Sequence, residues 1–123
     1  MSDPVRSVTA FVVLTADPTD PLILLARRMK LFDCGALMVE GSPPAIVSER
    51  DLLRAIADGQ GHLLAKDLAT PSALSVDADA DIGEAAALMV MAQVRHLLVE
   101  DGERFGIVSM RDLVEPLLAS ALQ

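Results

Sequence analysis

The sequence predicts a mixed α+β fold in which two similar β-α-β-β-α repeats form one compact module. The chain has 123 residues, 52% of them hydrophobic, which is enough to bury a sizeable core. Short apolar segments alternate with longer segments of helical periodicity. The first half also aligns with the second half, which indicates two copies of one structural unit. Identical residues at equivalent positions are Leu14 and Leu74, Asp17 and Asp77, Ala26 and Ala86, Met29 and Met89, Leu37 and Leu97, Val39 and Val99, and Glu40 and Glu100.

Polar residues are repeated together with core residues. The string Ile-Val-Ser-x-Arg-Asp-Leu occurs at residues 46–52 and again at residues 107–113. A shared fold is enough to explain repeated apolar residues, but a repeated Ser-x-Arg-Asp requires a local physical reason. We therefore expect the functional site at these two strings.

The second repeat, residues 61–123, shows the plan of one unit most clearly. Its elements are a strand at 73–76, a helix at 82–92, a hairpin of strands at 95–99 and 105–108, and a last helix that begins at Ser109. Asp81 is the expected N-cap of the first helix. Pro116 must lie near the start of the last helix or kink it.

The first repeat, residues 1–60, follows the same plan. Its elements are a strand at 8–15, a helix that Asp20 caps and Pro21 starts, a hairpin at 37–40 and 45–47, and a last helix at 51–57. Residues 58–62 contain two glycines and form the joint between the repeats. A three-stranded sheet with two helices leaves one apolar face uncovered, so we expect the repeats to pack sheet to sheet, in an α/β sandwich-like arrangement.

Charge and composition argue against several classes of function. The net charge of -8 opposes extended contact with nucleic acid or with an anionic membrane surface. No apolar run approaches the ~20 residues that span a bilayer, and the N-terminus has no features of a signal peptide. Cys34 is the only cysteine, so no intramolecular disulfide can form. We therefore expect a soluble cytoplasmic protein.

Neither an enzyme nor a metal protein is expected. The sequence contains no recognisable set of nucleophile, acid and base. Cys34, His62 and His96 are too few and too scattered for a zinc site. The acidic residues at 77–81 lack the glycine position and the closing glutamate of a calcium-binding loop.

The repeated string combines groups that suit a sugar phosphate. The first turn of a helix presents N–H groups and the positive end of the helix dipole, and both favour a phosphate. A serine adds a hydroxyl, an arginine can face a phosphate, and the carboxylates of Asp51 and Asp112 suit the two vicinal hydroxyls of a ribose. The same Ser-x-x-Asp pattern is also a helix capping box, in which these side chains only hold backbone N–H groups.

The string, with the preceding His-Leu-Leu-Val-Glu-Asp-Gly at residues 96–102, resembles the CBS domain. Two such units in tandem resemble a CBS pair, or Bateman module, and the resemblance covers residues 5–118. It implies a regulatory module that binds adenosine-containing ligands such as AMP, ADP, ATP or S-adenosylmethionine in clefts between the repeats. Such a module usually performs no chemistry itself and needs no cofactor beyond the nucleotide that regulates it.

The resemblance also implies which residues line the two clefts, because one repeat holds the sugar while the other supplies the base pocket. The first cleft, which we call the basic cleft, contains Thr15, Asp17, Cys34, Gly35, Arg95, His96, Ser109, Arg111 and Asp112. The second cleft contains Ser48, Arg50, Asp51, Ser75, Asp77, Val94 and Arg95. At its phosphate end it has Gly35 and Ala36 where the basic cleft has Arg95 and His96. Each missing charge-assisted hydrogen bond could cost roughly 1.5–3 kcal/mol, so we expect a phosphorylated ligand to favour the basic cleft.

These expectations give one leading hypothesis and two alternatives. The leading hypothesis is a stand-alone sensor of AMP, ADP or ATP, and so of energy state, that signals by contact with an unknown effector protein. We expect a homodimer formed through the leucine-rich helix ends at 52–57 and 113–122. The first alternative is a ligand-free structural or dimerisation module whose Ser-x-Arg-Asp strings only cap helices. The second is a sensor of S-adenosylmethionine, whose positive charge suits the acidic protein but not Arg95 and Arg111.

Overall fold

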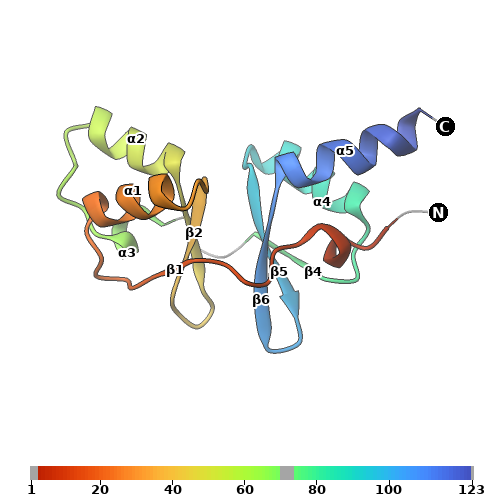
Figure 1. Ribbon diagram of the computed structural model, residues 1–123, viewed down its shortest axis with the longest axis horizontal. Coiled ribbons are helices and arrows are strands. Elements are labelled where there is room, and N and C mark those ends of the chain that lie inside the picture. Colours follow the sequence, from red (N-terminus) through yellow and green to blue (C-terminus); the bar gives the residue numbers. More distant parts are fainter. Residues whose placement is uncertain (1–2, 70–73, 123) are drawn as a thin grey trace. The chain divides into compact units, whose positions relative to one another are not determined.

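The computed structural model describes residues 3–69 and 74–122 (Figure 1). It contains two three-stranded sheets and their helices, which confirms the predicted mixed α+β fold and the β-α-β-β-α order of both repeats. The elements of the first half are η1 (Val5–Val8), β1 (Thr15–Ala16), α1 (Leu22–Leu31), β2 (Ala36–Val39), β3 (Ala45–Ser48) and α2 (Glu49–Ala57). Those of the second half are α3 (Ala65–Leu68), β4 (Ser75–Asp77), α4 (Ile82–Ala92), β5 (His96–Asp101), β6 (Arg104–Ser109) and α5 (Met110–Ala121).

The two sheets share one topology and one register. In each, the central strand pairs in parallel with the first strand and antiparallel with the third. Thr15 lies opposite Met38, and Ser75 lies opposite Leu98 at the equivalent position. The hairpin register is also shared, because Val39 pairs with Ala45 as Val99 pairs with Gly106. The sequence repeat is therefore a repeat of backbone structure.

The structure divides into two compact units that differ from the two sequence repeats. The first, which we call the middle unit, is Val13–Ser72, and the second, the terminal unit, combines Met1–Val12 with Ala73–Gln123. The short helices η1 and α3 explain the difference between these units and the expected ranges 1–60 and 61–123, because each docks on the unit that the other half of the chain forms. Val5 of η1 is fully buried in the core of the terminal unit, and Ala65 of α3 is fully buried in the core of the middle unit.

The two short helices dock in the same way. In the terminal unit, the N–H groups of Val5 and Arg6 donate to the carbonyls of Ala80 and Ala78, over 2.7 and 3.0 Å. In the middle unit, the N–H groups of Ala65 and Lys66 donate to the carbonyls of Asp20 and Pro18, over 2.8 and 2.9 Å. These are the equivalent positions and the same two bonds. The terminal unit thus includes η1 from the first half of the chain, and the middle unit includes α3 from the second half.

The prediction of a strand over residues 8–15 was wrong. Only Thr15 and Ala16 form β1, and residues 8–12 belong to the terminal unit. Ala10 exchanges both backbone hydrogen bonds with Ile107 on β6, over 3.0 and 2.9 Å. The first part of this segment therefore pairs with a strand that lies almost a hundred positions later in the chain.

The capping predictions had mixed outcomes. The helix α4 begins and ends as predicted, and the Asp81 side chain accepts a hydrogen bond from the N–H of Gly83 at 3.3 Å. Asp20 was wrongly predicted to cap α1, because Pro21 is the N-cap residue. The Asp20 carboxylate instead accepts from the N–H of Asp17 and forms an ion pair with Arg28, both at 2.9 Å.

Each unit has its own apolar core beneath its sheet. Equivalent residues contribute to both cores, including Leu37 and Leu97 on the central strands and Leu52 and Leu113 on the last helices. The helix α5 continues past Pro116 to Ala121. Within residues 3–69 and 74–122, no helix has the length and hydropathy that a membrane-spanning segment requires.

Candidate functional site

Both Ser-x-Arg-Asp strings form complete capping boxes at the start of a helix. On α5, Oδ2 of Asp112 accepts from the N–H of Ser109 at 2.8 Å and from its hydroxyl at 2.7 Å. The Ser109 oxygen in turn accepts from the N–H of Asp112 at 3.2 Å. On α2, Ser48 and Asp51 make the same three bonds over 2.8, 3.0 and 3.3 Å. The strings therefore fix the start of each helix, as the capping interpretation expects.

The residue before each hairpin lies beside this helix start. The N–H of Met110, the first residue of α5, donates to the carbonyl of Arg95 at 2.8 Å. His96 follows Arg95 and lies directly opposite Ser109 on the sheet. The backbone of this basic pair therefore lies beside the start of α5 within the terminal unit. In the middle unit, the same bond joins Glu49 to the carbonyl of Gly35.

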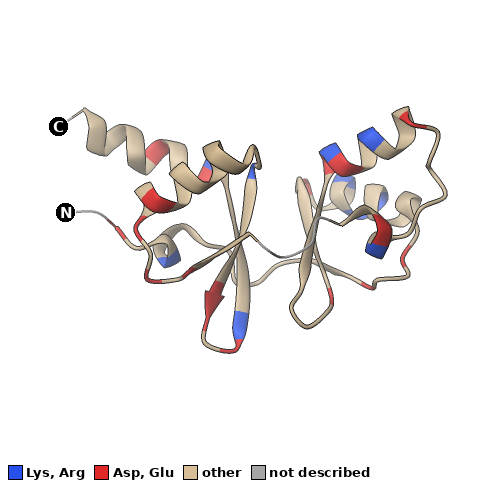
Figure 2. Ribbon diagram, turned by 180° about the vertical axis from the view of Figure 1, so that it is seen from behind, with Lys and Arg blue, Asp and Glu red and all other residues tan. Residues whose placement is uncertain are grey.

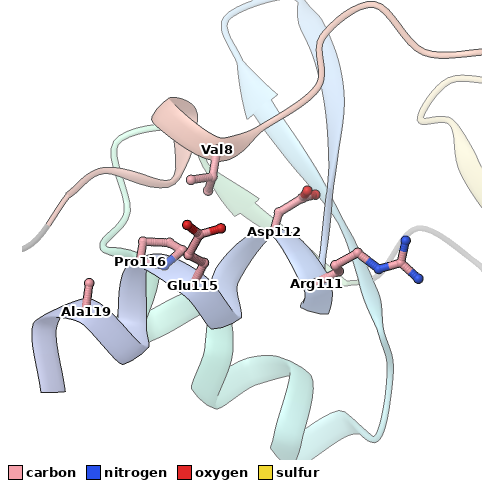
Figure 3. Close-up of a pocket in the computed structure, with 6 residues that line it drawn as sticks. All are labelled: Val8, Arg111, Asp112, Glu115, Pro116 and Ala119. Carbon is pink, nitrogen blue, oxygen red and sulfur yellow. The ribbon is translucent and has the colours of Figure 1, made fainter. Parts of the chain in front are cut away.

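An open hollow of about 580 Å³ lies along α5 in the terminal unit (Figure 3). It is lined by Val8, Arg111, Asp112, Glu115, Pro116 and Ala119. Asp112 and Glu115 point toward the side where Val8 lies, and the guanidinium of Arg111 points away from both carboxylates. The hollow therefore presents hydrogen-bond acceptors and apolar carbon at one end and a positive charge at the other.

The segment that carries Val8 is held firmly on the terminal unit. We call residues 3–11 the strap. Arg6 forms ion pairs with Asp79 at 2.7 Å and with Asp101 at 3.2 Å. The hydrogen bond to Asp79 is the main cause that raises the pKa of Arg6, and the charge of Asp101 raises it further. The hydrogen bonds from Arg104, and then the charge of Arg6, lower the pKa of Asp101.

Further along the strap, close packing replaces ion pairs. The guanidinium carbon of Arg104 lies 4.0 Å from the centre of the Phe11 ring, a cation–π contact. Figure 2 shows acidic and basic residues together at the tip of the β5–β6 hairpin, where the ion pair between Arg104 and Asp101 lies. A side chain on Gly106 would collide with the strap, because a Cβ there would lie 2.6 Å from the carbonyl oxygen of Ala10.

The other residues predicted for the terminal unit lie near the ends of its strands. Ser75 and Asp77 are the first and last residues of β4, and Val94 follows α4. The Asp77 carboxylate accepts from the N–H of Asp79 at 2.9 Å. Arg95, Arg111 and Asp112 are exposed, so a ligand in solvent can reach them.

In the middle unit, the predicted residues lie at equivalent places. Thr15 opens β1, and Asp17 follows it with its carboxylate bound by the hydroxyl and the N–H of Thr19, which lowers the pKa of Asp17. Cys34 is half-buried, and this burial raises the pKa of its thiol, so the residue favours a packing role over a reactive one. Arg50 is exposed on the first turn of α2. Each predicted cleft combines residues of both units, so the two cleft groupings stay predictions.

Sequence reasoning did not select four of the residues that line the hollow: Val8, Glu115, Pro116 and Ala119. Glu115 could have been found, because residues three apart on a helix lie on the same side, and Glu115 is three after Asp112. Val8 could not, because its place depends on the docking of the strap. Within the described part of the chain, no group of three or more His, Cys, Asp or Glu side chains is placed to hold a metal ion.

Comparison with known proteins identifies a family and a fold. The CBS-domain family model matches residues 65–119. An uncharacterized protein of Methanopyrus kandleri is 30% identical over 121 residues, which cover 90% of this chain and 62% of that protein. This chain therefore spans less than two thirds of that relative.

Solved structures agree with the family match. A protein with CBS domains from Burkholderia ambifaria superposes with a TM-score of 0.79 at 27% identity, covering 88% of this chain and 84% of that one. CBSX2, solved in complex with AMP, superposes with a TM-score of 0.77 at 22% identity, covering 97% and 98% of the two chains. At that identity, the second likeness shows the fold alone.

Proposed function

The chain belongs to the CBS-domain family, and from this premise we propose that it is a regulatory module that binds an adenosine-containing ligand at the start of α5. The observation that carries the proposal is that Ser109, Arg111 and Asp112 stand together at the start of α5, where Arg111 and Asp112 are exposed and line the hollow. A regulatory role, with no chemistry of its own, fits the signalling modules that CBS domains form.

Asp112 can take part in the cap and bind a ligand together. Both of its side-chain hydrogen bonds to Ser109 end on Oδ2. A carboxylate has acceptor positions on both oxygens, so Oδ1 can accept hydrogen bonds from the hydroxyls of a ribose. The cap holds the carboxylate in place, which reduces the entropy lost when the ligand binds.

The charge of the terminal unit favours a ligand with a phosphate. Arg111 stands on the first turn of α5, and the backbone of Arg95 is bonded to that turn. The positive end of the helix dipole and two arginines together suit a phosphate group. The middle unit has Gly35 in place of Arg95, so we propose that it binds the same ligand more weakly. The AMP complex of CBSX2, which has the same fold, supports a nucleotide as the ligand class.

The proposed output is a change in a protein contact. Several large apolar side chains on the last helix of each unit are exposed: Leu53 and Ile56 on α2, and Val114 and Leu118 on α5. Exposed apolar side chains of this number on two helices suit a protein interface. We propose that these helices form a homodimer and that an effector protein responds to the ligand-bound form.

A purely structural module is the second candidate function. The observation in its favour is that both capping boxes are complete, so capping alone explains the repeated Ser-x-x-Asp. In that case the strings would contribute about 1 kcal/mol each to stability and would bind no ligand.

The melting temperature of the purified protein tests the proposal against this alternative. The ligands are adenosine, AMP, ADP, ATP and S-adenosylmethionine, with GMP as the control for the base. A ligand at 100 times its dissociation constant adds ~2.7 kcal/mol of stability, which raises the melting temperature by several degrees. We expect a rise with AMP or another adenine nucleotide and none with GMP. If only S-adenosylmethionine raises the melting temperature, the proposed ligand is S-adenosylmethionine and not a nucleotide. If no adenosine compound raises the melting temperature, the result supports the structural module.

A further inference from the structure

We propose that the homodimer is antiparallel, so that the helices of the middle unit of one copy pack against the helices of the terminal unit of its partner. A two-fold axis then makes the same contact twice and closes the dimer. The inference rests on the proposed function, because it specifies how the proposed homodimer forms. We call the exposed side of α1 and α2 the middle face and the exposed side of α4 and α5 the terminal face.

Exposed apolar side chains gather on these two faces. Figure 1 shows α1 beside α2 and α4 beside α5. Among the described residues, every exposed large hydrophobic side chain except Val12 lies on one of these four helices or directly after it. Leu31 and Leu53 on the middle face, and Met91 and Val114 on the terminal face, are each more than half exposed. This amount of apolar surface in contact with water favours a protein partner for each face.

The two faces carry opposite net charges (Figure 2). Two charged residues are left out of the comparison: Arg28 is half-buried and paired with Asp20, and the Asp112 carboxylate belongs to the cap and points into the hollow. The exposed charged residues that remain give a formal charge of +3 on the middle face and -1 on the terminal face. They are Arg27, Lys30, Glu49, Arg50 and Arg54 on the middle face, and Glu84, Arg111 and Glu115 on the terminal face.

The fold does not require the positive charge of the middle face. Arg27 and Lys30 on α1 lie where α4 has Ala87 and Val90, and all four side chains are exposed. Because the two units share one backbone plan, the same helix positions accept neutral side chains. A partner with a less positive surface gives these two basic residues a purpose that folding does not.

Charge distinguishes the two ways in which two copies can pair through these helices. In a parallel dimer, each face meets its own copy, so that +3 meets +3 at the middle contact. In the antiparallel dimer, +3 meets -1 at both contacts. Exposed apolar side chains are buried in either arrangement, whereas like charges across an interface disfavour the parallel one. The chain as a whole carries -8, so the middle face is the surface most able to attract another copy.

Three variants of the full chain test the orientation. The middle variant carries Arg27→Glu and Lys30→Glu, which change the charge of the middle face from +3 to -1. The terminal variant carries Glu84→Gln and Ala87→Arg, which change the charge of the terminal face from -1 to +1. The combined variant carries all four substitutions. Sedimentation equilibrium at about 50 mM salt, where charges are weakly screened, gives the dissociation constant of each dimer.

The antiparallel dimer predicts loss and recovery. The middle variant and the terminal variant should each weaken the dimer roughly tenfold or more, because each makes like charges meet at both contacts. The combined variant should recover most of the wild-type affinity, since opposite charges meet again. The matched control carries Lys66→Glu and Glu103→Arg, two exposed residues outside the four helices, and should stay within twofold of the wild type.

A mixture of the wild type and the combined variant gives a second, independent result by native mass spectrometry. In the antiparallel arrangement, a mixed dimer brings like charges together at both contacts, so the two homodimers should persist. In a parallel arrangement, the mixed dimer brings opposite charges together and would predominate. Melting temperatures within about two degrees of the wild type would show that the variants remain folded.

The outcomes separate the orientation from the function on which it rests. If mixed dimers predominate, or if the middle variant dimerises as tightly as the wild type or more tightly, the antiparallel orientation is wrong and the proposed homodimer stands. If the wild type is a monomer at every concentration, the homodimer and its orientation are both wrong, and the two faces serve another protein. The ligand site is tested separately by the melting temperatures with adenosine compounds.

Discussion

The middle and terminal units have the same backbone plan but differ around the start of the last helix. Their sheets share one register, and their Ser-Asp capping boxes have hydrogen bonds that differ by at most 0.3 Å. The residues around these boxes differ in charge: Arg95 and His96 replace Gly35 and Ala36, and Glu115 replaces Arg54. The repeated string therefore accounts for a shared helix start, and the proposed difference in ligand binding rests on the surrounding residues.

A second difference lies on the last strand. Gly106 of the terminal unit and Ala45 of the middle unit occupy the same register position. The strap crosses the sheet at Gly106 so closely that a Cβ would lie 2.6 Å from both the Ala10 carbonyl oxygen and the Thr9 methyl group. The alanine of the middle unit shows that this strand position accepts a Cβ where no such close approach is made. The glycine is thus explained by the strap and not by the strand.

The largest expected effect comes from making the two units alike at this position. Gly106→Ala should push the strap off β6 and lower the free energy of unfolding by roughly 1–3 kcal/mol, because well-packed sites do not accept an added methyl group. Amide hydrogen exchange should show that the N–H groups of Ala10 and Ile107 lose their protection, since these two residues are bonded to each other across the site.

The reverse substitution is the matched control. Ala45→Gly adds backbone freedom to the middle unit and removes a partly buried methyl group, and it should cost about 1 kcal/mol, with no change at the strap. Equal costs for the two substitutions, together with unchanged exchange at Ala10 in Gly106→Ala, would show that the strap does not press on β6.

The regular elements were predictable because their signals are local. The periodicity of residues 82–92 and the apolar hairpins specify their elements within a few neighbouring positions, and the structure confirms them. The strap was not predictable, because an apolar segment such as residues 8–11 resembles a strand of its own repeat until its distant partner is known. The four-residue helix α3 is too short to show a period. The Ser-x-Arg-Asp strings were found for the same local reason as the helices, whereas the role of Val8 in the hollow depends on long-range docking.

A smaller effect concerns the acid sensitivity of the strap. Asp101 pairs with Arg6 and Arg104, and Asp79 also faces Arg6. Because the folded-state pKa of Asp101 is lowered, its contribution is fully present above its ordinary value of 3.8 and is lost as the pH falls through the lower folded value. The protection factors of the Val5 and Arg6 amides should therefore decrease as the pH falls below about 4.

The variant Asp101→Asn isolates this contribution. Its protection factors at Val5 and Arg6 should already be lower at neutral pH and should change less on acidification. Ala65, the equivalent of Val5 in the middle unit, serves as an internal reference in both proteins. Identical pH profiles for the wild type and Asp101→Asn would show that Asp101 does not hold the strap.

The most direct test of the central claim is the binding of AMP by calorimetric titration to the wild type, Asp112→Ala and Asp51→Ala. Because the two aspartates make equivalent caps, each substitution should cost a similar ~1 kcal/mol of stability. If the terminal unit carries the ligand site, Asp112→Ala loses AMP binding and Asp51→Ala keeps most of it. Equal AMP affinity in all three proteins, or no AMP binding in the wild type, would contradict the account and leave the two strings as helix caps alone.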